Sequence, residues 1–242
     1  MKYLLISISL VLLSCKEEAP HSSLSSIDIM NKSIQFHDPK GEWDSTPLAL
    51  HIEEPRIGNP TRYSELNLDK AKGTFHLLRH RNGHFSTHIV DAEGALEVYL
   101  DNEVVTEDSI VKKFRLDPER NLRYQYSYEQ MLGLPMSLLE GENTFGPVEE
   151  VHYNQIAAYK IPVDLEKALF SKQWNIYIAK STYAYLGMDL LSEEDPQGGE
   201  RLYFEGIFLI KSMKLPRHKH WHYLSSDDYL GSDMIIKVLE EQ

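Results

Sequence analysis

The sequence predicts an α+β protein in which a mainly antiparallel sheet of about a dozen strands wraps a helix. Three observations lead to this fold class. Most of the chain after residue 45 alternates polar and apolar residues in short runs, which is typical of half-buried strands. Two segments have helical spacing instead, one before the strands and one in their middle. No internal repeat or change in composition marks a boundary, so residues 27–242 are expected to form a single domain.

The first 14 residues are expected to be an export signal. Lys2 is followed by an apolar run from Leu4 to Leu13. This run is too short to span a bilayer core, which takes roughly 20 apolar residues, and has the order of a secretory signal. The next residues, Leu12-Leu13-Ser14-Cys15, resemble the lipobox of bacterial lipoproteins. The resemblance implies cleavage before Cys15 and its acylation, so the expected partner is a membrane that holds the acyl chains of Cys15.

Residues 15–26 are expected to form a lipidated tether, because they are polar and contain Pro20 and four serines. Lys16 takes the place of the aspartate that typically retains lipoproteins at the inner membrane, which favours the outer membrane. The start Cys15-Lys16-Glu17-Glu18 also resembles a signal that directs lipoproteins to the cell surface. Anchoring at the periplasmic face and anchoring at the cell surface therefore both stay open.

Charge and cysteine content narrow the function classes further. The net charge of −12 argues against nucleic acid as a partner and against adhesion of the domain itself to anionic lipid. Cys15 is the only cysteine in the chain. An internal disulfide is therefore excluded, and the domain must be stabilised by its apolar core.

Two helices are predicted from their caps and stops. The first is expected to begin at Ser26 as the N-cap and to end near His37, before Pro39. The second is expected to begin at Asp117-Pro118-Glu119, which supplies a cap, a first-turn proline and an acid, and to run to about Leu132.

The remaining segments read as strands separated by turn residues. The expected strands are 46–53, 61–68, 73–80, 84–91, 94–101, 148–153, 156–163, 174–180, 184–190, 201–210, 213–224 and 229–238. A three-residue loop, Arg81-Asn82-Gly83, is expected between the third and fourth strands. That register places four histidines together on one polar face: His76, His80, His84 and His88.

Three motifs resemble an uncharacterised lipoprotein family common in Bacteroidota. They are Ile34-Gln35-Phe36-His37-Asp38-Pro39 with Gly41 and Trp43, then Met131-Leu132-Gly133-Leu134-Pro135-Met136, and finally Leu215-Pro216 with Trp221, Tyr223 and Tyr229-Leu230-Gly231-Ser232-Asp233. The resemblance covers about residues 27–239. It implies the open half-barrel of the periplasmic lipoprotein carriers (Lol-type), with about 10–12 strands wrapped around one or two helices. This chain departs from the family pattern in its high histidine content and its acidic loop at residues 192–195.

The resemblance favours a non-enzymatic module that binds a lipid or another elongated apolar ligand in the concave face. Residues expected at this site are Trp43, Tyr126, Leu132, Leu134, Met136 and Trp174. The segment after Leu132 is expected to act either as a mobile lid or as a permanent plug. The alternative from another class is a structural or interaction lipoprotein with a filled core, acting through its outer face.

A third alternative is a metal-binding surface protein. His218, His220 and His222 alternate on one predicted strand and share a face. Because same-face residues are about 6.8 Å apart, two neighbours with a ligand from elsewhere form the expected zinc or copper site. No cofactor is expected otherwise. No nucleophile elbow, phosphate loop or His-Glu-x-x-His motif is present, so catalysis is not favoured and an unrecognised hydrolase stays open.

Overall fold

The computed structural model describes residues 24–59, 61–195 and 198–240. The predicted signal, Cys15 and the tether up to residue 23 lie outside the described residues. Within the described ranges, no helix combines the length and the apolar character needed to cross a membrane.

One antiparallel sheet contains every strand of the described chain. The strands are β1 (Leu48–Glu53), β2 (Tyr63–Asp69), β3 (Thr74–Arg81), β4 (His84–Val90), β5 (Leu96–Leu100), β6 (Thr144–Phe145), β7 (Glu149–Tyr153), β8 (Ile156–Leu169), β9 (Ser171–Ala179), β10 (Tyr185–Leu191), β11 (Gly199–Ile210), β12 (Met213–Tyr223) and β13 (Tyr229–Val238). Their order is β5-β4-β3-β2-β1-β13-β12-β11-β10-β9-β8-β6, and β7 also pairs with β8. The two ends of this order do not pair, so the barrel is open.

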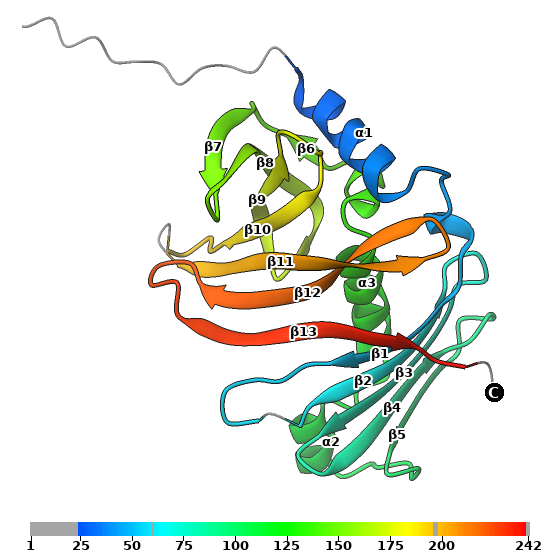
Figure 1. The fold of residues 1–242 in the computed structure, drawn as a ribbon. Helices are drawn as coiled ribbons and strands as arrows, with labels where there is room; N and C mark the ends of the chain where they lie inside the picture. The colour runs from blue at the N-terminus through cyan, green and yellow to red at the C-terminus, as the bar shows by residue number, and fades with distance from the viewer. Residues whose placement is uncertain (1–23, 60, 196–197, 241–242) are drawn as a thin grey trace, which may run out of the picture.

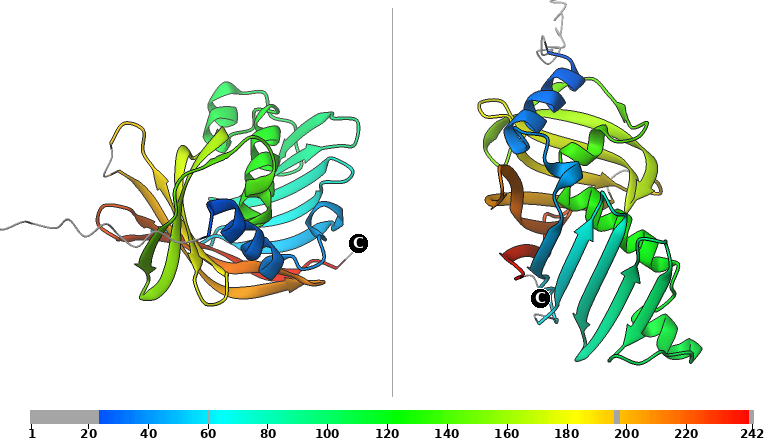
Figure 2. Two further views of the ribbon diagram at one scale, coloured as in Figure 1. Left: turned by 90° about the horizontal axis from the view of Figure 1, so that it is seen from above. Right: turned by 90° about the vertical axis from the view of Figure 1, so that its right-hand side faces the viewer.

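The described helices are α1 (Ser26–His37), α2 (Asp108–Phe114) and α3 (Arg120–Leu132). Short 3-10 turns follow at η1 (Trp43–Ser45) and η2 (Met136–Leu139). The sheet curves round α3, with β1–β5 on one side of it and β8–β10 on the other, as the view from above shows (Figure 2). The chain thus builds one half of the sheet, passes through its concavity as α2 and α3, and then builds the other half (Figure 1).

The sequence prediction of a mainly antiparallel half-barrel around one or two helices is close to this architecture and differs in detail. The sheet has 13 strands rather than 10–12, because the two-residue β6 is too short to have a pattern. Strands β8 and β9 also extend through residues 164–172, which the sequence assigns to a turn region. Helix α2 is missed because it has no buried residue and therefore no apolar stripe. The N-cap of α1 is Ser25, one residue earlier than predicted, in a capping box with Asp28.

The end of α3 and the turn after it divide their side chains between two apolar cores. Met131, Leu134 and Leu138 pack with β8–β12 and α1, whereas Leu132 and Met136 pack with β1–β4. Each large apolar side chain buried in this way contributes about 1.5–3 kcal/mol. Residues 131–138 therefore plug one end of the half-barrel.

Gly133 allows Trp43 to close this plug. A Cβ at position 133 would lie 2.4 Å from Cζ2 of Trp43 and 2.7 Å from the backbone oxygen of Glu129. Such distances are too short for any side chain, so the indole packs directly on the glycine backbone. Trp43 Nε1 also donates a hydrogen bond to Glu140 (2.8 Å). These contacts favour a permanent plug over a mobile lid.

The hairpin between β3 and β4 corrects the predicted register. His80 lies opposite Phe85 and Arg81 opposite His84, so the loop has two residues, Asn82 and Gly83, both with positive φ. These two residues suit a tight hairpin turn. The four histidines consequently do not share a face. The predicted register was wrong because it requires every inward residue of this hairpin to be apolar, whereas His88 and Arg81 also face inward.

His88, on the inner face of β4, is fully buried and joins the sheet to α3. Its Nδ1 lies 2.9 Å from Oδ1 of Asn121, whose Nδ2 donates to the carbonyls of Ile89 and Glu97, both at 2.8 Å. Ser86 Oγ lies 3.2 Å from Nε2 of His88. Burial lowers the pKa of His88 to about 4, so this histidine is a neutral structural group that fixes α3 to β4 and β5.

His37 has the same role at the end of α1. Its Nδ1 contacts the carbonyl of Lys214, and the backbone N–H of Tyr185 donates to its Nε2 (2.9 Å). An acceptor on one ring nitrogen and a donor on the other require the neutral tautomer with the proton on Nδ1. Burial lowers the pKa of His37 to about 4.

We predict that the protein loses stability between about pH 6.5 and pH 4. Below pH 6.5 the unfolded state protonates His37 whereas the folded state does not, so the free energy of unfolding falls as pH falls. A pKa near 4 in the folded state corresponds to a loss of about 3 kcal/mol at pH 4. Urea unfolding between pH 4 and pH 7 measures this slope.

His37→Gln retains a donor and an acceptor but cannot titrate, so it should remove the part of the slope that His37 contributes and leave the part that His88 contributes. The same change at His152, which is exposed on β7, should leave the slope as it is. An unchanged pH dependence in His37→Gln would refute the assignment.

Candidate functional site

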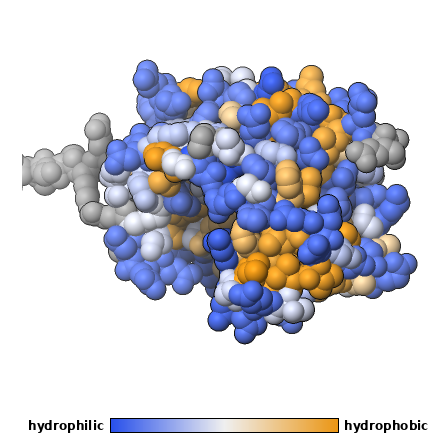
Figure 3. All heavy atoms as spheres, turned by 90° about the horizontal axis from the view of Figure 1, so that it is seen from below, coloured by the Kyte–Doolittle hydropathy of each residue, from blue (hydrophilic) through white to orange (hydrophobic). Residues whose placement is uncertain are grey.

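A pocket opens on the concave side of the sheet, beside residues 124–132 of α3. Its cavity volume is about 600 Å³, within the range of roughly 300–1,000 Å³ typical of small-molecule sites. Its walls come from β1, β3, α3, β11, β12, β13 and the loops next to them. Seen from below, the molecular surface is hollowed next to an area of apolar side chains (Figure 3).

Basic side chains dominate the pocket, although the whole chain has a net charge of −12. Those that line it are Arg56, Arg62, Arg79, Arg81, Arg115 and Lys219. The acidic residues that line it are Glu54, Glu200 and Asp233. Six positive and three negative charges leave a formal charge of +3 when Lys219 is protonated. A concave wall of low dielectric strengthens the resulting field, so the pocket attracts anions that the outer surface repels.

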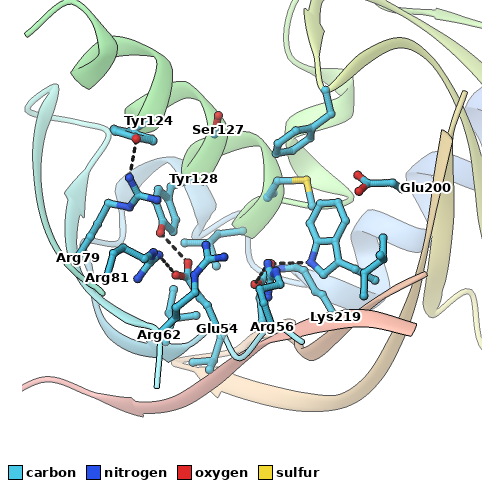
Figure 4. A pocket seen from close by; sticks show the side chains of 18 of the residues that line it. Glu54, Arg56, Arg62, Arg79, Arg81, Tyr124, Ser127, Tyr128, Glu200 and Lys219 are labelled. Atoms are coloured by element: carbon cyan, nitrogen blue, oxygen red, sulfur yellow. Dashed lines mark hydrogen bonds and ion pairs between the residues drawn. The ribbon is translucent and has the colours of Figure 1, made fainter. Parts of the chain in front are cut away.

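Glu54, near the end of β1, holds the largest group of these side chains. Its Oε2 accepts hydrogen bonds from Arg81 and from Ser64 Oγ (3.1 Å), and its Oε1 accepts one from Tyr128 of α3 (3.0 Å). Figure 4 shows Arg81 and Tyr128 converging on this carboxylate. Glu54 therefore neutralises one arginine and ties β1, β3 and α3 together at the floor of the pocket.

Asp233 on β13 holds a second group. Its Oδ1 accepts from Arg56 Nη2 (2.6 Å), and its Oδ2 accepts from Trp221 Nε1 (2.7 Å). Burial raises the pKa of Asp233, and the hydrogen bonds from Arg56 and Trp221 oppose that rise. Arg56 approaches closely because Gly231 has no side chain; a Cβ there would lie 2.4 Å from Arg56 Cδ.

Among the described residues, only Arg56 and Arg81 of the pocket's six cations form ion pairs, and Lys219 and Arg62 are the more buried of those that do not. Lys219 is only 5% exposed, and within the described chain its ammonium group makes no ion pair or side-chain hydrogen bond. Burial lowers its pKa to about 8. Arg62 points into the pocket (Figure 4), and its buried Nε has no acceptor among the described residues. Burial, and then repulsion by Arg81, lower the pKa of Arg62. A partly buried cation without an ion-pair partner costs free energy, and an anion bound at this position would lower that cost.

The other part of the pocket is apolar. Met131 and Leu132 of α3 face it from one side, and Phe170, Trp221 and Ile235 complete this part of the wall. Glu200 lies away from Arg79 and Arg81 (Figure 4). Cationic and apolar side chains thus share the walls of one pocket, with Arg56 6.0 Å from the centre of the Trp221 ring, a combination that suits an amphiphile.

The six residues expected to bind ligand are placed differently. Leu132 lines the pocket. The other five lie in or against the packed cores: Trp43 and Met136 with β1–β4, Leu134 and Trp174 with β8–β12, and Tyr126 at the edge of that second core. Tyr126 OH also donates to the carbonyl of Lys167 (3.1 Å). Five of the six therefore belong to the interior that shapes the half-barrel.

The arginines were missed by the sequence reasoning, although the pattern contained a signal. On β3 the residues of the inner face are Phe75, Leu77, Arg79 and Arg81, so an apolar row continues as a cationic row. Lys219 likewise lies between the inward positions of β12 that hold Leu215 and Trp221. A cation at an inward position of an amphipathic strand indicates a binding site or a buried ion pair.

We predict that Glu54→Ala lowers the free energy of unfolding by about 3–5 kcal/mol, because it leaves Arg81 buried without a counter-ion. Urea denaturation at pH 7 measures the loss. Glu53→Ala is the matched control, since Glu53 is exposed on the same strand, and should stay within about 0.5 kcal/mol of the parent. Equal effects of the two variants would show that the buried pair is not a main source of stability.

The fold is similar to solved structures, whereas the sequence matches no family model and no curated protein. The resemblance to the uncharacterised lipoprotein family therefore stays a prediction.

The fold is similar to that of a LolA superfamily protein from Nitrosomonas europaea, with a TM-score of 0.54, 8% identity, and 91% of this chain and 96% of that chain covered. It is also similar to a domain from Vibrio parahaemolyticus described as an outer membrane lipoprotein-sorting protein, with a TM-score of 0.50, 10% identity, and coverage of 88% and 94%. The described chain has the open, mostly antiparallel half-barrel fold of the LolA type.

Proposed function

We propose that this protein is an outer-membrane-anchored lipoprotein that binds an amphiphile with an anionic head group and an apolar chain. The observation that carries the proposal is the pocket, in which unpaired cations and an apolar wall share one cavity inside an acidic protein. The proposed role is binding or carriage rather than catalysis. One of the similar structures is described as a lipoprotein-sorting domain, which agrees with an acylated ligand.

The proposed orientation of the ligand follows from the side chains that line the pocket. Its head group lies against Arg62 and Lys219, where charge-assisted hydrogen bonds replace the missing counter-ion. Its chain lies against Met131, Phe170 and Trp221. A second cavity of about 200 Å³ borders Arg62, Arg79, Arg81 and Arg115 from the other side, so a larger head group has room at the cationic end.

The alternative of an interaction lipoprotein with a filled core has support from the two packed cores. That alternative does not explain why Arg62 and Lys219 face the pocket, because neither residue belongs to those cores. The amphiphile proposal accounts for both the packed plug and the unpaired cations.

We predict that Arg62→Ala and Lys219→Ala each weaken binding of a long-chain fatty acid roughly 10- to 100-fold, since hydrogen bonds to charged groups contribute about 1.5–3 kcal/mol. Titration calorimetry on a chain that begins at Leu24, which keeps every described element, measures the affinity. Lys72→Ala removes the same charge from a side chain that is 73% exposed and should leave affinity unchanged.

Binding of the alcohol of the same chain length shows how much of the affinity comes from the carboxylate. It should bind the parent protein weakly and should be insensitive to both substitutions. Equal affinity for acid and alcohol would contradict an anionic head group, and no affinity for either would contradict the proposed function.

Lys219 provides an independent check at pH 8. Its pKa of about 8 means that about half of the molecules carry the proton, and a nearby anion raises that pKa. Fatty-acid binding at pH 8 should therefore take up about half a proton, visible as a dependence of the binding enthalpy on the buffer. Lys219→Ala should abolish this uptake, and its persistence would place the anion elsewhere.

We also predict that Cys15→Ala abolishes acylation, because Cys15 is the only thiol in the chain. Cells labelled with radioactive palmitate should show label on the parent protein and none on the variant. The parent should fractionate with the outer membrane. Label that persists in Cys15→Ala would refute the predicted lipid anchor.

A further inference from the structure

The convex face of the sheet, opposite the pocket, carries a cluster of metal-ligating side chains. Strands β11, β12 and β13 present this face toward the viewer in Figure 1, with α3 behind them. His218 lies directly opposite Glu205 of β11, and His220 follows two residues later on the same face of β12. The ligating atoms of these three side chains all lie within 4.8 Å of one another.

We propose that Glu205, His218 and His220 form a binding site for a zinc ion. Two imidazole nitrogens and one carboxylate oxygen are a donor set that zinc uses where the remaining position is open to water. Ligands about 2.0–2.2 Å from a zinc ion are no more than about 4 Å from one another. The side chain of Glu205 is 76% exposed, so it is free to rotate and close the remaining gap.

A neighbouring hydroxyl already orients one ligand. His220 Nδ1 lies 2.7 Å from Oγ of Ser232 on β13, and Ser232 Oγ also lies 2.7 Å from the hydroxyl of Tyr229. With Nδ1 engaged in this way, Nε2 is the nitrogen left to bind the metal, and it lies 3.4 Å from Glu205 Oε2. Such a partner for the second nitrogen accompanies most metal-binding histidines.

His222 does not belong to this site, in contrast to the sequence expectation that grouped it with His218 and His220. Its Nδ1 lies 2.7 Å from the carbonyl of Asp227, and its ring packs against Tyr203 and Tyr229. The sequence predicted that two neighbouring histidines need a third ligand from elsewhere, and Glu205 is positioned to supply it.

The zinc site is independent of the amphiphile pocket. Lys219 and Trp221 point to the concave side between the histidines, so the two sites share a strand but no ligand. Failure of one proposal therefore leaves the other standing.

The test is titration of the purified full-length chain with Zn²⁺ after removal of metal with a chelator. One Zn²⁺ per chain is expected. His218→Ala and His220→Ala should each weaken zinc binding at least 10-fold, and Ser232→Ala should weaken it about 10-fold through the loss of orientation. Mg²⁺, which prefers oxygen ligands, should not compete.

His222→Ala is the matched control, because it removes a histidine of the same strand and face and should leave zinc affinity unchanged. Thermal unfolding without metal should be similar for the histidine variants, since the side chains of His218, His220 and His222 lie on the outer face. The proposal is overturned if the parent binds no stoichiometric zinc, or if His222→Ala weakens binding as much as His220→Ala. Zinc binding that survives the double change at positions 218 and 220 would also overturn it.

Discussion

The structure depends on the insertion of one helix into a sheet that does not close. An open, curved sheet has more concave surface than a single helix can cover, so α3 fills one end and leaves the other. The division is made at Met131 and Leu132, which face different cores. The turn after α3, with Trp43 packed on Gly133, completes the plug. The pocket is therefore the part of the concavity that the helix does not fill.

The pocket differs from the rest of the molecule in its charge. The chain has a net charge of −12, whereas the side chains that line the pocket have an excess of arginine. Glu54 and Asp233 balance Arg81 and Arg56 and keep the cationic wall folded. They do not balance Arg62 and Lys219. A ligand that supplies the missing negative charge would relieve the cost of these buried cations, so the same residues contribute both affinity and selectivity for an anion.

The sequence predicted α1, α3 and most strands because their signals are local: caps, tight turns and alternation of apolar residues. It did not predict what depends on tertiary contacts. The register of the β3–β4 hairpin was wrong because His88 is buried by Asn121 of α3, which no local pattern contains. The large aromatic and aliphatic residues expected at the site, such as Trp174, form the core instead, since size and hydrophobicity do not separate lining from packing. Glu205 lies beside the two histidines because β11 pairs with β12, and no local sequence pattern predicts the register of that pair.

The pairing of β1 with β13 has a consequence for how the protein reaches its folded state. These strands lie near opposite ends of the described chain, yet they are neighbours at the centre of the sheet. The first five strands therefore cannot join the rest of the sheet until almost the whole chain has been synthesised. Contacts of such long sequence separation slow folding. The strand pair that joins the two halves of the sheet therefore forms late, after the consecutive hairpins within each half.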